Sequence, residues 1–135
     1  MLETDIRRWF VCESSNRWYN AVRRFAPAMT PKPFILDVVS VTPDFVLDAI
    51  PPTLPSIVLW EVLPESLPLA AESLRVVHGR CRHTLQLVAG SHLSDREQML
   101  LCELPIAMVV QQPEQLPRLL PLIQGHFASA TEPVD

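Results

Sequence analysis

Residues 56–62 have the sequence Ser-Ile-Val-Leu-Trp-Glu-Val, a nearly continuous run of apolar and β-branched side chains. A run of this length without alternation is typical of a strand that is buried on both faces of a parallel sheet. Pro55 and Pro64 bound it on either side, and prolines mark loops. This segment is therefore predicted to be a central strand.

Outward from this strand, the apolar patterns of strands and helices alternate along the chain. Short apolar runs predict four further strands, at residues 9–12, 34–39, 85–89 and 106–110. Apolar side chains spaced three or four residues apart predict helices at 18–25, 43–50, 66–81, 94–104 and 116–127. This order indicates right-handed βαβ crossovers. We expect a three-layer, doubly wound α/β fold with a five-stranded parallel sheet in the order 2-1-3-4-5.

Local signals predict where several helices begin and end. Ser15 or Asn16 is expected to cap the first helix, and Pro27 is expected to lie beyond its end. Ser94 and Glu97 have the spacing of a capping box, a specific signal for a helix start.

The last helix contains two prolines one turn apart, Pro117 and Pro121, and is expected to be kinked or split. Residues 129–135 are predicted to form a polar tail. No repeat or linker divides the chain, so we expect a single domain over residues 1–135 with a core of about 7–128.

Composition argues against several functional classes. The chain has 135 residues, of which 48 % are hydrophobic and 19 % charged, and its net charge is −4. A nucleic-acid binder would need a basic stripe. No apolar run approaches the roughly 20 residues of a membrane span. Residues 1–8 lack the apolar core of a secretory signal, so we expect a cytoplasmic protein that binds neither nucleic acid nor membrane.

Cysteine and histidine spacing gives no sign of a metal or redox site. Cys12, Cys81 and Cys102 are far apart, and the interpretation is that all three are buried free thiols in a reducing compartment. The four histidines are equally scattered, and no two have the spacing of ligands on one helix face. With three glycines, the chain has no phosphate-cradling glycine motif. We therefore expect no metal and no cofactor.

Polar side chains gather where the predicted strands end, which is the edge that carries ligands in doubly wound folds. Glu13, Ser14, Glu61 and Ser91 lie there. The two glutamates could bind a cation or act as acid and base, or each could accept hydrogen bonds from the nearby backbone. One hypothesis is therefore a small flavodoxin-like enzyme or ligand-binding protein that uses this rim.

Three stretches resemble the receiver domain of bacterial two-component response regulators, over roughly residues 7–128. Residues 55–64, Pro-Ser-Ile-Val-Leu-Trp-Glu-Val-Leu-Pro, are similar to the family's third strand, which ends in the phospho-accepting aspartate. Residues 109–113, Val-Val-Gln-Gln-Pro, are similar to the fifth strand, which ends in Lys-Pro. Residues 10–14, Phe-Val-Cys-Glu-Ser, are similar to the first strand, which ends in paired acids that hold magnesium.

The departures from this family concern the residues that carry phosphoryl transfer. The acceptor position is Glu61 when counted from Pro55 and Trp60 when counted back from Pro64, so no aspartate is present. The lysine position is Gln112, and the only lysine, Lys32, precedes the second strand.

Two further positions also depart from the family. The Ser/Thr position is Ala89, although Ser91 is close, and the acid pair is reduced to Glu13 and Ser14. The resemblance therefore implies a non-catalytic pseudo-receiver that acts in bacterial signalling by binding another protein. In such a domain Glu61 either mimics the phosphorylated state or belongs to a site that has decayed to packing, with Trp60 buried. We expect the second.

Receivers commonly associate through the fourth helix, fifth strand and fifth helix, which implies an interaction face here, either for a protein partner or for a second copy of the chain. This face would comprise Arg96, Met99, Leu100, Glu103, Gln111, Arg118 and Gln124. Leucine-rich positions of this kind can instead belong to the core.

Two further alternatives remain open. The arginines of the first predicted helix, Arg17, Arg23 and Arg24, are either a solvated face or a contact for an acidic partner. A true receiver with a shifted site would have to use Asp37, Asp44 or Asp48, none of which ends the first or third strand.

Overall fold

The computed structural model describes the backbone of residues 6–29 and 35–131, and the side chains of residues 6–26 and 35–127. Strands and helices alternate along this chain. Their bounds are β1 (Ile6–Cys12), α1 (Arg17–Met29), β2 (Ile35–Val41), α2 (Val46–Ala49), β3 (Ser56–Glu61), α3 (Leu67–Arg80), β4 (Thr84–Ala89), α4 (Asp95–Leu101), β5 (Met108–Val110) and α5 (Leu120–Thr131). Three 3₁₀ helices, η1 (Pro43–Phe45), η2 (Pro64–Ser66) and η3 (Pro113–Leu119), lead into α2, α3 and α5.

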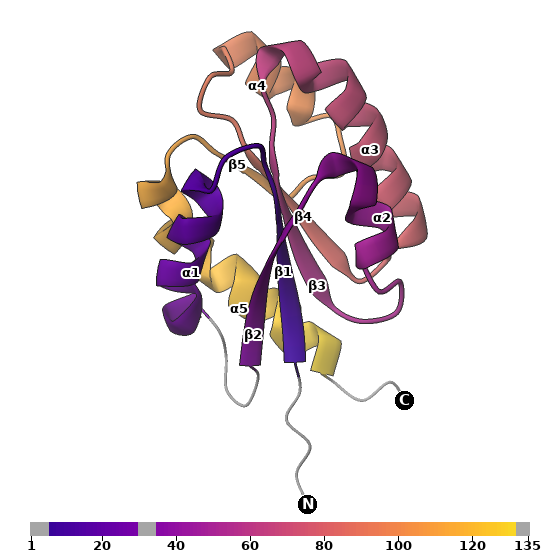
Figure 1. The fold of residues 1–135 in the computed structure, drawn as a ribbon, viewed down its shortest axis with the longest axis vertical. Coiled ribbons are helices and arrows are strands. Elements are labelled where there is room, and N and C mark those ends of the chain that lie inside the picture. Colours follow the sequence, from indigo (N-terminus) through magenta and orange to yellow (C-terminus); the bar gives the residue numbers. More distant parts are fainter. Residues whose placement is uncertain (1–5, 30–34, 132–135) are drawn as a thin grey trace, which may run out of the picture.

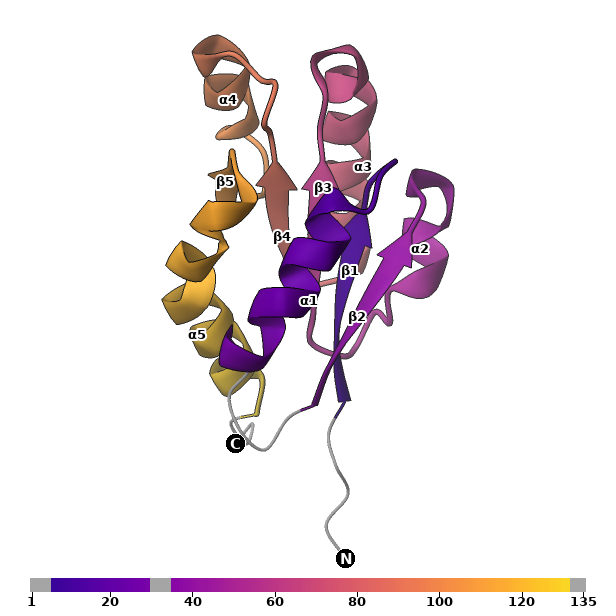
Figure 2. The ribbon, with the colours of Figure 1, turned by 60° about the vertical axis from the view of Figure 1, so that its left-hand side comes forward.

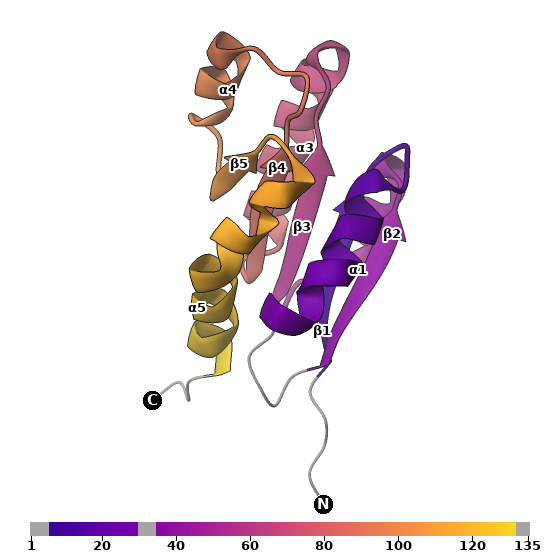
Figure 3. The same ribbon diagram turned by 90° about the vertical axis from the view of Figure 1, so that its left-hand side faces the viewer.

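The strands form one parallel sheet in the order β2-β1-β3-β4-β5, which confirms the predicted α/β fold class and strand order. The arrangement is that of a flavodoxin-like fold. Figure 1 shows the sheet between two layers of helices. α1 and α5 cover one face, as Figures 2 and 3 show from the side, and α2, α3 and α4 cover the other. All strands run the same way, so their carboxyl ends meet at one edge.

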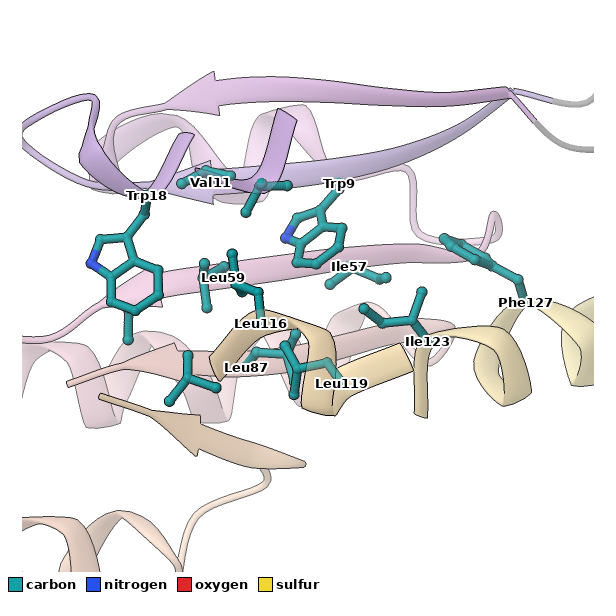
Figure 4. Packing of buried hydrophobic residues seen from close by; sticks show 13 residues of the cluster. Trp9, Val11, Trp18, Ile57, Leu59, Leu87, Leu116, Leu119, Ile123 and Phe127 are labelled. Carbon is teal, nitrogen blue, oxygen red and sulfur yellow. The ribbon is translucent and has the colours of Figure 1, made fainter. Parts of the chain in front are cut away.

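One hydrophobic core fills the space between the sheet and the α1–α5 layer (Figure 4). Alternate residues of the strands point into it, as the pleat of a sheet requires. Its largest side chains are Trp9 on β1, Trp18 on α1 and Phe127 on α5, all of them fully buried. The apolar stripe predicted for the last helix faces this core. It consists of Leu116, Leu119, Ile123 and Phe127, which are buried, and Leu120, which is half-buried.

The second core lies between the other face of the sheet and α2, α3 and α4. The intervening strand residues supply it, among them Phe10, Val58 and Trp60. β3 is buried along almost its whole length, which confirms it as a central strand.

Several predicted boundaries are wrong. α1 continues through Pro27 to Met29, because a proline, which lacks the amide donor and crowds the carbonyl four residues earlier, can kink a helix without ending it. α4 ends at Leu101 and not near residue 104, because Glu103 and Leu104 donate to carbonyls three residues earlier and tighten the chain into a turn. β5 is correspondingly short, since its pairing with β4 begins only at Met108.

The prediction that the last helix is distorted is confirmed. The segment begins as η3, which contains Pro117, and becomes α-helical only at Leu120, one residue before Pro121. α5 then runs to Thr131, so residues 129–131 are helical and the predicted tail begins too early. The rest of that tail, 132–135, lies outside the described residues.

The cysteine prediction is correct for two residues and wrong for one. Cys12 and Cys81 are buried free thiols, one in β1 and the other directly after α3. Cys102 is exposed, because it follows the last residue of α4 and the inward position there belongs to its neighbour Leu101. Within the described part of the chain, none of the helices has both the length and the apolar character needed to cross a membrane.

Candidate functional site

Glu13 follows β1 at the carboxyl edge of the sheet, and its carboxylate caps α1. Oε2 accepts a hydrogen bond from the backbone N–H of Trp18 at 3.0 Å, and Oε1 accepts one from that of Tyr19 at 2.7 Å. Those amides are the second and third of the helix, which have no partner inside it. The predicted position of the cap is correct, since Asn16 precedes the first residue of α1 and its carbonyl accepts a bond from the N–H of Asn20. The side chain that does most of the capping is nevertheless Glu13, because the Ser15 hydroxyl accepts only a long 3.5 Å bond from the N–H of Arg17.

The carboxyl of Glu13 is partly buried and lies near the charge of a second glutamate, Glu61. Burial raises the pKa of its carboxyl above the usual 4.5, the hydrogen bonds from Tyr19 and Trp18 lower it, and the nearby charge of Glu61 raises it again. Burial first, and then the charges of Glu61, Glu13 and Asp44, raise the pKa of the neighbouring Cys12 thiol to about 12. Two carboxylates, Glu13 and Glu61, therefore lie near each other at this edge, and the charge of Glu61 disfavours ionisation of Glu13.

The guanidinium of Arg17, on α1, forms hydrogen bonds with the loops that follow β4 and β5. Nη2 of Arg17 donates to Oε1 of Gln112 at 2.7 Å, and Nη1 donates to the hydroxyl of Ser91 at 3.4 Å. The Ser91 hydroxyl in turn donates to the carbonyl of Gln111 at 2.7 Å. The position that would hold a lysine in a receiver thus holds an amide that accepts a hydrogen bond from Arg17.

In the sequence, Arg17 stands out only as one of three arginines on the first helix, and this role is not among the predictions. The signal that could have revealed it is its place as the first residue of the helix after the first strand, which brings it to the functional edge.

Of the two candidate acceptor positions, only Glu61 belongs to the edge. It ends β3 on the same face as Glu13, and its Oε1 accepts a hydrogen bond from the hydroxyl of Ser14 at 3.4 Å. Successive strand residues point to opposite faces, so Trp60 points into the second core. There its Nε1 donates to Oε1 of Gln86 at 3.0 Å, and the Gln86 amide donates to the Leu74 carbonyl at 2.9 Å.

The remaining site positions divide in the same way. Ala89 is fully buried in the first core and offers no side chain to the edge. The other five lie at the edge in separate hydrogen-bonded groups: Arg17 bonds Ser91 and Gln112, Ser14 bonds Glu61, and Glu13 bonds the backbone of α1. Among the residues whose placement is described, no group of three or more His, Cys, Asp or Glu side chains is arranged to hold a metal ion.

The positions proposed as an interaction face are mostly open to solvent. Met99 is 72 % and Leu100 50 % exposed, so the alternative that these two are core residues is wrong. Arg96, Glu103, Arg118 and Gln124 are also exposed, whereas Gln111 is half-buried.

Comparison with known proteins adds nothing to these observations: no family model matches the sequence, and no curated protein matches it.

Proposed function

We propose that this chain is a pseudo-receiver, a non-catalytic domain that acts in bacterial cytoplasmic signalling by binding another protein. The observation that carries the proposal is the hydrogen bonding at the carboxyl edge of a sheet with the order 2-1-3-4-5. There Glu13 caps α1, and Arg17 is held by Gln112 and Ser91. The polar groups of the edge are engaged with one another.

Phosphoryl transfer to this edge would lack its main physical requirements. An acceptor carboxylate must lie in line with the phosphoryl donor, and Glu61 is one methylene longer than the aspartate that the family uses. Magnesium needs several hard oxygen ligands, but both oxygens of Glu13 already accept backbone hydrogen bonds. The edge therefore favours a structural role over catalysis.

The contacts also favour decay of the site over mimicry of a phosphorylated state by Glu61. A mimic would need its charge to be read by the groups around it. The hydroxyl of Ser91 is bonded to Arg17 and Gln111, and the only hydrogen bond described for the carboxylate of Glu61 comes from Ser14.

The alternative of a ligand-binding protein or enzyme that uses Glu13, Ser14, Glu61 and Ser91 has less support. The carboxylate of Glu13 and the hydroxyl of Ser91 already form hydrogen bonds with the backbone of the chain. The carboxylates of Glu13 and Glu61 would also repel the phosphates of a flavin nucleotide, and the guanidinium of Arg17 is already bonded to Ser91 and Gln112.

Phosphorylation of the purified protein tests the proposal. Incubation with acetyl phosphate and Mg²⁺, followed by intact-mass spectrometry, should leave the mass unchanged. The triple variant S14D/E61D/Q112K, which restores the family's residue type at three of the four departing positions and leaves Ala89, is the matched comparison. A wild-type protein that gains one phosphoryl group, lost again in E61Q, would overturn the proposal.

A further inference from the structure

An open groove of about 280 Å³ separates α3 from α4, on the face of the sheet opposite α1 and α5. Its walls are apolar: Leu67 and Ala71 come from the α3 side, and Leu100 and Leu104 from the α4 side. Figure 1 shows the two helices side by side where the strands end. Apolar grooves on a surface often mark a site where another molecule binds.

The outer side of α4 adds apolar surface next to this groove. Leu100, which lines the groove, is half exposed, and the adjacent Met99 is still more open. A single exposed apolar residue needs no explanation, but two beside an apolar groove form a surface that gains stability when covered.

Two charged residues of opposite sign line the groove, Arg75 on α3 and Glu103 after α4. Both are exposed, and no ion pair within 4.0 Å involves either of them in the described part of the chain. The groove thus carries no net formal charge, in a protein whose net charge is −4.

This charge arrangement complements itself. In a two-fold dimer a residue i of one copy meets j of the other, and j meets i in return. If two copies joined at this groove, Arg75 of each copy would therefore face Glu103 of the other, which gives two equivalent ion pairs. A strongly acidic or strongly basic partner surface would instead be matched best by a groove of the opposite sign throughout. Copies of a negatively charged chain also repel each other least where the surface is neutral.

We propose that the α3–α4 groove is a self-association surface, in which Leu100 of each copy enters the groove of the other and Arg75 pairs with Glu103 across the two-fold axis. The inference rests on the proposed function only in assuming that the chain acts by binding protein. It places the contact on α3 and α4, away from β5 and α5.

Sedimentation velocity over a range of concentrations tests this with single charge reversals. R75E and E103R each juxtapose like charges twice, so each should raise the dimer dissociation constant by about tenfold or more. An equimolar mixture of the two variants should form a heterodimer with the wild-type affinity, because both ion pairs are then restored. The double variant R75E/E103R should likewise dimerise. Both positions are exposed, and circular dichroism checks that each variant is folded.

R118E, a reversal on η3 outside the groove, is the matched control and should leave the dissociation constant unchanged. A wild-type protein that stays monomeric at all concentrations would overturn the inference, as would a dimer that only R118E weakens. A mixture that does not recover affinity would also count against it. None of these results affects the phosphorylation test, so the two proposals fail separately.

Discussion

Replacing Glu13 with alanine should destabilise the protein by removing the cap of α1. The change deletes two hydrogen bonds from backbone amides to a carboxylate, of 3.0 and 2.7 Å. The Trp18 amide is buried and would lose its partner, at a cost of about 1–3 kcal/mol, whereas the half-buried Tyr19 amide can partly turn to water.

Relief of the buried charge offsets part of this loss, since burial and Glu61 already disfavour the ionised carboxyl. We therefore expect a net loss of about 1–2 kcal/mol at neutral pH, in line with helix caps in general. An unfolding entropy of about 2.1 cal/mol/K per residue over 135 residues converts this to a fall in Tm of about 4–7 °C.

The dependence on pH gives the same cap a second signature. The pKa of Glu13 is raised in the folded state, so the folded protein holds its proton more tightly than the unfolded chain does. The free energy of unfolding contributed by this group therefore falls as pH rises from the ordinary pKa of 4.5 through the raised value. E13Q cannot titrate, so the stability difference between wild type and E13Q should shrink over that interval.

Urea denaturation followed by circular dichroism measures both effects. The matched control is E61Q, which removes a charge from the same edge without touching a backbone amide and should change the stability by less than about 0.5 kcal/mol. The reasoning is refuted if E13A is as stable as E61Q, or if the advantage of wild type over E13Q grows with pH in this interval.

Three other perturbations follow from single contacts. S94A should cost about 1 kcal/mol by removing the hydroxyl that accepts the Glu97 N–H in the capping box of α4, measured by thermal unfolding; an unchanged Tm would refute the box. Q86L should cost about 1–3 kcal/mol, because it leaves the buried Nε1 of Trp60 without an acceptor, and near-UV circular dichroism should show a disturbed tryptophan signal; a variant as stable as wild type in urea would contradict this. With iodoacetamide at mildly alkaline pH, Cys102 should react rapidly in the folded protein, whereas Cys12, buried and with its pKa raised to about 12, should react only in denaturant. Peptide mass spectrometry separates the two sites, and early labelling of Cys12 would contradict its burial.

The fold could be predicted because its signals are local and repeated. Each strand is predicted by a short apolar run, and each helix by apolar residues spaced three or four apart. The alternation of strands and helices along the chain then leaves few possible topologies. The capping box at Ser94 is equally local and is confirmed in full. Boundaries were less accurate, since the ends of α1, α4 and β5 depend on single backbone hydrogen bonds that composition does not reveal.

The site was predictable only in part, because its contacts join residues far apart in sequence. The sequence of residues 55–64 allows both Glu61 and Trp60 as the acceptor position of a receiver. Only the structure decides between them, because the two side chains lie on opposite faces of the sheet. The bond from Arg17 to Gln112 spans 95 residues, so the sequence can place Arg17 at the edge but cannot name its partner. Ala89, which the resemblance puts at the Ser/Thr position, is a core residue, and only the structure shows which way its side chain faces.

The central claim is that the polar side chains at the carboxyl edge bond within the chain and accept no phosphoryl group. Titrations with magnesium and then beryllofluoride, monitored by amide NMR, test this claim most directly. Beryllofluoride mimics a phosphoryl group on a carboxylate. The account predicts that the amides of Glu13, Glu61 and Gln112 keep their chemical shifts through both additions. Saturable shifts centred on these three residues would contradict it and would mean that the edge still binds the cation and the phosphoryl mimic.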